Sequence, residues 1–381
     1  MNTNEIQWKL HDGNITIDAK VPGGVYGSLM DSGKLTEGDF YYRFNDVNYR
    51  NYSYRNWTYF TSFEVPSNIW SESRIILEFL GLDTISDVTL NGRLVGKSFN
   101  MFARYIWDVT SYLKKESLQT LEIEFQSPVE WSRKAYEKQA QDYEVYPDCV
   151  PSSYKGECHV NHIRKMQSSF SWDWGPAFPN MGIWKPWNLI GFSTLRIKDI
   201  LIFTKPTSPI VVFDVAVINK EISGKLRVDI STHTYLEKKI NVTPKSSKFF
   251  IEVKFIILKG VMKTWWPNGY GNQPIYNLTV TWSADNTHEE NHKTIIVGFR
   301  TVELDQSFVE PETKEFGHHF RFKVNGVTIF LKGSNWVPSH VLPERMNQDY
   351  MNRLLIDAAD THQNCIRVWG GGIYESDEFY K

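Results

Sequence analysis

Short alternating runs of apolar and polar residues, broken by glycine and proline, fill roughly the first 300 residues, and this pattern most constrains the fold. In TLEIEF (120–125), Leu, Ile and Phe alternate with Thr and Glu, so one face of a strand is apolar and the other polar. Asn91-Gly92 separates two further runs, as is typical of a β-hairpin. Many short strands joined by tight turns predict a mainly β chain built of sandwiches.

Three domains are expected along the 381 residues. Residues 1–195 predict a jelly roll, with KAYEKQAQDYE (134–144) as its main helical or loop-like exception. Residues 196–300 alternate cleanly, as in YNLTVTW (276–282), and their length fits an immunoglobulin-like sandwich without the disulfide of antibody domains.

The pattern changes in residues 301–381. VTIFLKGSNW (327–336) predicts a strand, residues 347–362 a helix, and NCIRVWGGG (364–372) a second strand. Strand, helix and strand form a unit of a parallel sheet, and a further helix is expected to begin near Ser376. Because a complete (β/α)8 TIM barrel takes about 250 residues, we expect only the start of a truncated barrel here.

Composition excludes several classes of partner. The net charge of −2 and the lack of a basic stripe argue against nucleic acid, and no apolar run approaches the ~20 residues that span a bilayer. No signal peptide stands in this sequence. Five Asn-x-Ser/Thr sequons nevertheless favour the secretory route; they begin at Asn14, Asn51, Asn56, Asn241 and Asn277.

The three cysteines suggest one disulfide and no metal site. Cys149 and Cys158 flank a loop rich in Pro, Gly and Ser, so a disulfide that closes the loop is favoured over two free thiols. No second Cys/His pair has the spacing of zinc ligands. Cys365 lies in an apolar strand and is expected to be a buried thiol.

Two tryptophans bracket a single carboxylate in SFSWDWGP, where Trp172 and Trp174 flank Asp173. Apolar surface is usually hidden, whereas a carboxylate is usually exposed. The residues alone leave two interpretations open. Either a structural tryptophan cluster surrounds an aspartate that caps a turn, or indole walls and a carboxylate acceptor form a sugar pocket.

Tryptophans also follow both expected barrel strands, at the ends where the active sites of such barrels gather. Trp336 and Trp369 each either line a ligand site or pack beneath a loop. Arg367 points to the same side of its strand as Trp369, and if that side faces a barrel interior, it is a buried cation that needs a carboxylate partner. Glu375 is expected to be an acid in the first turn of the last helix.

The chain resembles β-mannosidases, from the glycoside hydrolase family that also holds β-galactosidases and β-glucuronidases, and the resemblance runs from about residue 20 to the last residue. It rests on YYRFNDVNYRNYSYRNWTY, SFSWDWGPAFP, TWWPNGYGNQPIYNLTV, FLKGSNWVP and IRVWGGGIYESDEFY. It is nearest to the animal lysosomal type, which shares DCVP…KGECHVN and therefore implies the Cys149–Cys158 pairing. The implied architecture is a jelly-roll sugar-binding domain, an immunoglobulin-like sandwich and a TIM barrel.

The resemblance also implies roles for the tryptophans. Trp172, Asp173 and Trp174 would close a pocket around a terminal mannose, and Trp369 would line it. Arg367 would orient the catalytic nucleophile, and Trp336 would support the pocket. The substrate would be a β-mannoside oligosaccharide, including those derived from N-glycans, and no cofactor is implied.

Catalysis in this family uses two glutamates, one as acid/base and one as nucleophile, in a retaining mechanism. In relatives they follow barrel strands four and seven, whereas this sequence ends after strand two. Its Asn4-Glu5 pair lies far from any barrel motif. We therefore expect both catalytic glutamates beyond Lys381 and no hydrolysis by these 381 residues alone.

Three functions are compatible with these observations. The first is the N-terminal part of an exo-acting β-mannosidase that reaches the lysosome by the secretory pathway. The second is a non-catalytic carbohydrate-binding protein. The third is cleavage of β-glucosaminides or β-galactosides, although the paired WDW and RVWGGG motifs favour mannose.

Overall fold

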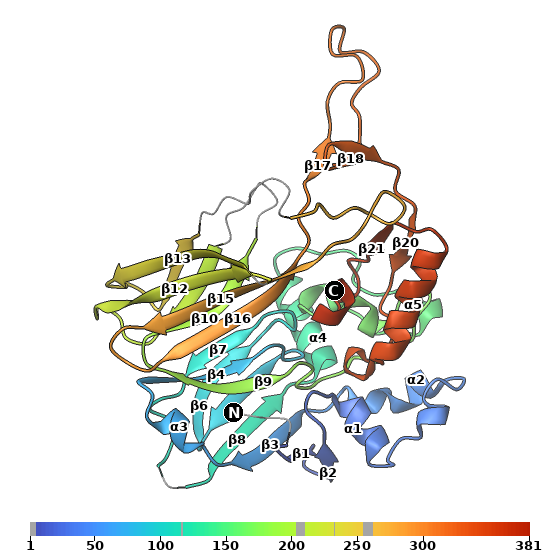
Figure 1. Ribbon diagram of the computed structural model, residues 1–381. Coiled ribbons are helices and arrows are strands. Elements are labelled where there is room, and N and C mark those ends of the chain that lie inside the picture. The colour runs from blue at the N-terminus through green and yellow to red at the C-terminus, as the bar shows by residue number, and fades with distance from the viewer. Residues whose placement is uncertain (1–4, 116, 203–209, 232, 254–261) are drawn as a thin grey trace. The chain divides into compact units, whose positions relative to one another are not determined.

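The computed structural model describes residues 5–115, 117–202, 210–231, 233–253 and 262–381 (Figure 1). These residues form two compact units. The first consists of the chain up to Gly191 together with Asn335–Asn352 and Val368–Tyr380. The second consists of Phe192–Ser334 and Arg353–Arg367, with Lys381. The first unit is therefore discontinuous in the sequence, and its first and last segments carry all four residues of the predicted pocket.

The first unit is built on two sheets. The six-stranded antiparallel sheet has the order β2-β1-β3-β8-β5-β6, and the three-stranded sheet has the order β7-β4-β9. The strands are β1 (Trp8–His11), β2 (Thr16–Ala19), β3 (Trp57–Phe63), β4 (Arg74–Phe79), β5 (Ser86–Leu90), β6 (Arg93–Ser98), β7 (Tyr105–Asp108), β8 (Gln119–Phe125) and β9 (Trp187–Phe192). Strand β8 buries every second residue, as the sequence predicts. Asn91 and Gly92 join β5 to β6 with φ of 54° and 77°, which confirms the predicted hairpin.

The core of the first unit contains many of the aromatic side chains. The Trp187 ring lies 5.7 Å from Trp8, 5.6 Å from Phe63 and 6.0 Å from Phe79, centroid to centroid. Trp8, Trp57 and Trp187 are each at most 1% exposed. Such rings bury 150–250 Å² each and contribute strongly to core stability. Much of the high tryptophan content therefore serves the core.

Four helices lie on the loops of this unit: α1 (Val25–Asp31), α2 (Asn45–Asn48), α3 (Ser67–Trp70) and α4 (Pro128–Gln139). The α4 helix begins where Ser127 Oγ accepts a hydrogen bond from the Glu130 amide at 3.1 Å, with Pro128 in the first turn. It therefore starts upstream of the stretch 134–144, and the end of that stretch lies in turns.

The second unit contains a three-stranded and a four-stranded antiparallel sheet, in the orders β10-β11-β14 and β13-β12-β15-β16. Their strands are β10 (Leu195–Leu201), β11 (Ile210–Val215), β12 (Ile222–Ile230), β13 (His233–Val242), β14 (Lys248–Glu252), β15 (Tyr276–Ala284) and β16 (Glu290–Val297). Leu278, Val280 and Trp282 of β15 are buried in one core with residues of both sheets. The mainly β prediction is confirmed, while the immunoglobulin-like assignment and the domain boundaries stay predictions.

The later elements are β17 (Val302–Asp305), β18 (Arg321–Val324), β19 (Val327–Ile329), β20 (Gly333–Trp336), α5 (Gln348–Asp360) and β21 (Cys365–Val368). The single strand expected over 327–336 is wrong: β19 pairs with β18, and β20 pairs with β21. The Cys365 amide donates to the Lys332 carbonyl and the Trp369 amide to the Trp336 carbonyl, so β20 and β21 run parallel. The order strand, helix, strand is as predicted, and the assignment to a TIM barrel stays a prediction.

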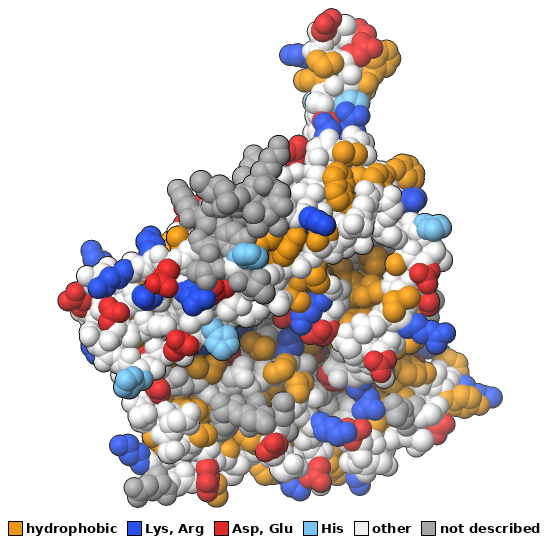
Figure 2. Space-filling view, viewed as in Figure 1, with side chains coloured by type: hydrophobic (Ala, Val, Ile, Leu, Met, Phe, Trp, Pro, Cys, Tyr) orange, Lys and Arg blue, Asp and Glu red, His pale blue; other side chains and the backbone are white. Residues whose placement is uncertain are grey.

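The loop between β17 and β18 extends beyond the ends of those strands (Figure 1). In the space-filling view, acidic and hydrophobic side chains lie at its tip (Figure 2), and Phe316 there is 76% exposed. Within the described ranges, no helix has both the length and the apolar character needed to cross a membrane.

Candidate functional site

The Trp-Asp-Trp sequence forms a tight hairpin in the first unit. The Trp172 amide donates to the Gly175 carbonyl at 3.0 Å, and the Gly175 amide donates back to the Trp172 carbonyl at 3.2 Å. The hairpin places Asp173 at its tip, where the side chain is exposed. Trp172 and Trp174 are 39% and 46% exposed. All 14 tryptophans lie in the described residues, and only these two are classed as exposed.

Trp369 lies between the two indoles of the hairpin. Its ring centroid is 5.0 Å from that of Trp172 and 5.3 Å from that of Trp174, with interplanar angles of 68° and 71°. Such edge-to-face contacts are favourable for aromatic pairs. The structure thus brings together the four residues predicted to form the pocket, and we call Trp172, Trp174 and Trp369 the tryptophan cluster.

The glycines after Trp369 form a turn, in which the Gly372 amide donates to the Trp369 carbonyl. A Cβ atom on Gly371 would lie 2.1 Å from the Trp369 ring, so a larger residue there would displace the indole. The Gly371 carbonyl accepts a hydrogen bond from the Ser168 amide at 3.1 Å. This bond ties the segment that follows β21 to the start of the tryptophan hairpin.

Trp336 and Glu375 form a supporting pair. The Trp336 Nε1–H donates to Glu375 Oε1 at 2.9 Å, and the Phe379 ring lies 4.8 Å from the Trp336 ring. Glu375 is only 6% exposed. The first-turn position expected for Glu375 is wrong: the last turn is a 3-10 turn over Asp377–Tyr380, and the Glu375 carboxylate points instead to the indole N–H. The role of Trp336 in supporting the pocket stays a prediction.

Arg367 is exposed, so the buried cation considered above does not occur in the described chain. The reason is local, because β21 pairs with β20 alone and no further described strand covers its outer edge. The role of Arg367 in orienting a nucleophile stays a prediction. Cys365 is partly rather than fully buried.

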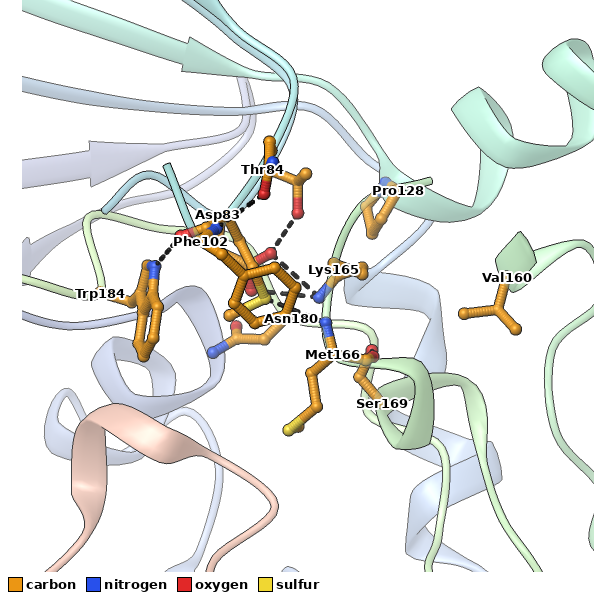
Figure 3. Close-up of polar contacts among 12 residues, drawn as sticks. Asp83, Thr84, Phe102, Pro128, Val160, Lys165, Met166, Ser169, Asn180 and Trp184 are labelled. Carbon is orange, nitrogen blue, oxygen red and sulfur yellow. Dashed lines mark hydrogen bonds and ion pairs between the residues drawn. The ribbon is translucent and has the colours of Figure 1, made fainter. Parts of the chain in front are cut away.

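The first unit also contains a set of buried polar residues that the sequence analysis missed. Lys165 Nζ lies 3.0 Å from Asp83 Oδ1 and 3.1 Å from Oδ2 (Figure 3), and the two residues are 2% and 5% exposed. The Thr84 hydroxyl also donates to Asp83. The Asp83 backbone exchanges hydrogen bonds of 2.9 and 2.8 Å with Gly182. A buried charge is expensive unless it is paired, and here it is paired.

A second contact joins Asn180 to Glu344. Asn180 Nδ2 donates to Glu344 Oε1 at 2.7 Å, and Asn180 Oδ1 accepts from the Tyr26 amide at 3.3 Å. Burial, together with the negative charge of Asp83, raises the pKa of Glu344 to about 7. Gly24 packs closely here, because a Cβ on it would lie 2.2 Å from Asn180 Nδ2. We call Asp83, Lys165, Asn180 and Glu344 the polar network.

No sequence signal marks the polar network. Its pairs are 82 and 164 positions apart, and neither follows a strand or helix period. An open hollow of about 480 Å³ lies on the outer face of the six-stranded sheet, where Phe60, Asp87 and Glu122 help to line it, and no residue of the tryptophan cluster lines it. In the ranges that the structure describes, no three His, Cys, Asp or Glu residues are placed to hold a metal ion.

The expected disulfide joins Cys149 to Cys158, which confirms the prediction. The asparagines of all five sequons are exposed. Asn4 of the Asn4-Glu5 pair lies outside the described residues.

Comparison with known proteins agrees with this architecture. Residues 7–185 match the family model described as the glycosyl hydrolase 2 galactose-binding domain-like. The curated proteins that are similar to this chain include β-mannosidases. It is 39% identical to the β-mannosidases of Rattus norvegicus and Capra hircus, over 384 and 388 residues. Both alignments cover 98% of this chain and 42% of the relative.

Solved structures of glycoside hydrolases are also similar to this chain. A β-D-mannosidase from Dictyoglomus thermophilum is 29% identical, with a TM-score of 0.83, over 98% of this chain and 44% of that one. An exo-chitosanase from Amycolatopsis orientalis, 17% identical with a TM-score of 0.69 over 99% of this chain and 41% of that one, shares the fold. The chain thus spans about two fifths of the length of the curated relatives it matches.

Proposed function

We propose that this chain supplies the sugar-binding side of a β-mannosidase active site. The observation that carries the proposal is the tryptophan cluster, in which Asp173 stands between two half-exposed indoles that contact Trp369. Indole faces stack on the apolar C–H face of a sugar ring, and a carboxylate is a strong acceptor for sugar hydroxyls. Homology to β-mannosidases favours a terminal β-mannose as that sugar.

Hydrolysis would follow the retaining mechanism, which needs two carboxylates about 5–5.5 Å apart. Near the cluster, Glu375 is buried and bonded to Trp336, which leaves Asp173 as an exposed acceptor. We therefore infer that these 381 residues bind mannosides but do not hydrolyse them. Release of nitrophenol from p-nitrophenyl β-mannoside by the purified chain would contradict this inference.

Binding can be measured by titrating the chain with β-1,4-mannobiose in a calorimeter. We expect weak but specific binding, with Asp173→Asn reducing the affinity at least about tenfold, because a charged acceptor is lost. Asp18→Asn, which changes an exposed carboxylate on β2, is the matched control and should leave the affinity unchanged. Equal affinity for galactobiose or chitobiose would favour the other specificities, and no binding of any sugar would refute the proposal.

A non-catalytic carbohydrate-binding protein is the second candidate. It is favoured by one observation: all members of the tryptophan cluster lie within the first compact unit. The titration and the nitrophenol assay together separate the candidates, because a longer chain that carries the barrel glutamates should hydrolyse the mannoside only if the first is right.

We also propose that the protein travels through the secretory pathway to the lysosome. The Cys149–Cys158 disulfide and the five exposed sequon asparagines support this route. Treatment of the protein from its native cells with an N-glycosidase should lower its apparent mass, and an unchanged mass would contradict the route.

A further inference from the structure

We propose that the polar network positions the tryptophan hairpin. We further propose that ionisation of Glu344, as the pH rises, weakens the contacts by which the network restrains the hairpin. The inference deepens the proposed function, on which it rests, because the hairpin is the part of the chain that would bind the sugar. None of the four network residues would touch the sugar in this account. They act through the backbone of the hairpin and are positioning residues.

The network holds the hairpin at both of its ends. Lys165 precedes Trp172 by seven positions and Asn180 follows Trp174 by six. Figure 3 shows the Lys165 side chain directed at Asp83, with Asn180 close by. The intervening chain has few regular hydrogen bonds, since it contains one 3-10 turn over Gln167–Phe170 and the hairpin itself. Fixing both ends therefore restricts where the indoles lie relative to Trp369.

The network also holds the segment Asn335–Asn352, which carries Trp336 and Glu344. Glu344 contacts Asn180, and its neighbour Arg345 bonds to Asp31 of α1 at 2.9 Å. Through the Trp336 carbonyl, this segment also holds the backbone of Trp369. A single set of buried contacts thus reaches both sides of the tryptophan cluster.

The charges of the network do not balance when both carboxylates are ionised. Lys165 supplies one positive charge, and its ammonium group lies on Asp83. The Lys165 charge also lowers the pKa of Glu344, but by less than burial and the Asp83 charge raise it. The Asn180 amide that bonds to Glu344 is neutral, and so is the Tyr59 hydroxyl, whose pKa is raised by burial and by the nearby carboxylates. Arg345, the neighbour of Glu344, forms an ion pair with Asp31 at 2.9 Å. One carboxylate is therefore in excess, and protonating it removes an uncompensated buried charge.

The direction of the pH effect follows from Glu344. Its pKa is about 7 in the folded chain against 4.5 for the free side chain, so the folded state binds the proton more tightly than an opened state does. The contact is strongest below about pH 4.5, weakens as the pH rises and is weakest above pH 7. Between pH 5 and 8 the equilibrium for opening should increase on the order of 50-fold.

The test is hydrogen exchange of the whole 381-residue chain, followed by mass spectrometry at pH 5 and pH 8 and corrected for the intrinsic rate. In the unaltered chain, the protection factors of peptides from 166–182 and 335–352 should be on the order of 50-fold lower at pH 8 than at pH 5. In Glu344→Gln, which keeps a neutral acceptor for Asn180, the protection should be the same at both pH values. Glu124→Gln, an exposed glutamate on β8, is the control and should behave like the unaltered chain.

Protection that does not change between pH 5 and 8 in the unaltered chain would overturn the proposal. So would a loss that persists in Glu344→Gln. If that variant does not fold, Asp83→Asn serves instead: with one carboxylate removed, Glu344 becomes the partner of Lys165, so the loss of protection should end about one pH unit lower and be about tenfold smaller. A merely structural role of Asp83 would not move the pH at which the loss ends.

The exchange experiment can succeed or fail independently of the proposed sugar binding. The exchange experiment contains no sugar, so it tests the network even if mannobiose does not bind. Titration with mannobiose at pH 5 and 8 adds the second arm. Binding that weakens at pH 8 in the unaltered chain but not in Glu344→Gln supports the positioning role, whereas equal weakening in both assigns the pH effect to the sugar contacts.

Discussion

The tryptophan cluster and the polar network both belong to the first unit, and each reverses the usual distribution of side chains. The cluster leaves two large apolar rings 39% and 46% exposed, whereas the network hides Lys165 and Asp83 at 2% and 5% exposure. Apolar groups are normally buried and charges normally exposed. The difference indicates a division of labour, in which the open indoles make contacts and the buried charges hold them in place.

The two regions should therefore respond differently to mutation. Removing one member of a buried ion pair leaves the other charge without a partner, and the cost appears in stability. Removing a half-exposed ring costs little stability, because the folded state hides only part of it. Of the three predictions that follow, the first tests the polar network and the third tests the tryptophan cluster. The second tests the supporting pair of Trp336 and Glu375.

The largest effect is expected for Lys165→Met, which has nearly the same length but no charge. Asp83 would remain buried without its cation, and the free energy of unfolding should fall by about 3–5 kcal/mol. Urea denaturation followed by circular dichroism measures it. The matched control is Lys97→Met, because Lys97 makes a 2.7 Å ion pair with Asp87 at the surface, and its loss should cost less than about 1 kcal/mol. Equal losses in the two variants would contradict the contrast.

An intermediate effect is expected for Trp336→Phe. The Glu375 carboxylate would lose its indole donor while remaining buried, so stability should decrease by about 1–3 kcal/mol. Glu375→Gln keeps an acceptor for the indole and should cost less. A double-mutant cycle from thermal unfolding gives the coupling energy of the pair. A coupling near zero would show that the 2.9 Å hydrogen bond contributes nothing.

The smallest effect on stability is expected for Trp172→Ala. The ring is partly exposed, so its removal should lower the free energy of unfolding by only about 1–2 kcal/mol. Trp187→Ala removes a ring that is 1% exposed in the core and should cost about 3–5 kcal/mol. Both variants can be compared by urea denaturation. A large loss in Trp172→Ala would mean that the cluster is structural.

The sequence predicted most of what depends on local pattern. Alternation in β8 and the Asn91-Gly92 turn were correct because strand faces and tight turns are determined by neighbouring residues. The grouping of Trp172 and Trp174 with Trp369 was predicted through the family resemblance, since nothing local brings positions 172 and 369 together.

The errors arose where distant contacts outweighed local preference. The run 327–336 has strand character throughout, but it contributes to two different sheets because each half finds another partner. Glu375 could have favoured a helix N-terminus, but the indole N–H of Trp336 holds it in the interior. Lys165 and Asp83 are unremarkable in sequence, because a buried pair is defined only by the surroundings that the fold gives it.

The discontinuity of the first unit also has a consequence for its synthesis. After Gly191 has been made, all of Phe192–Ser334 must follow before Glu344 and Trp369 can join the unit. At a translation rate of 5–20 residues per second, that interval lasts on the order of ten seconds. During it, Asn180 and the exposed indoles of the hairpin have no contact from the later segments. The nascent chain therefore passes through a stage in which the two indoles of the hairpin lack their contact with Trp369, and chaperones that recognise exposed apolar side chains have time to bind there.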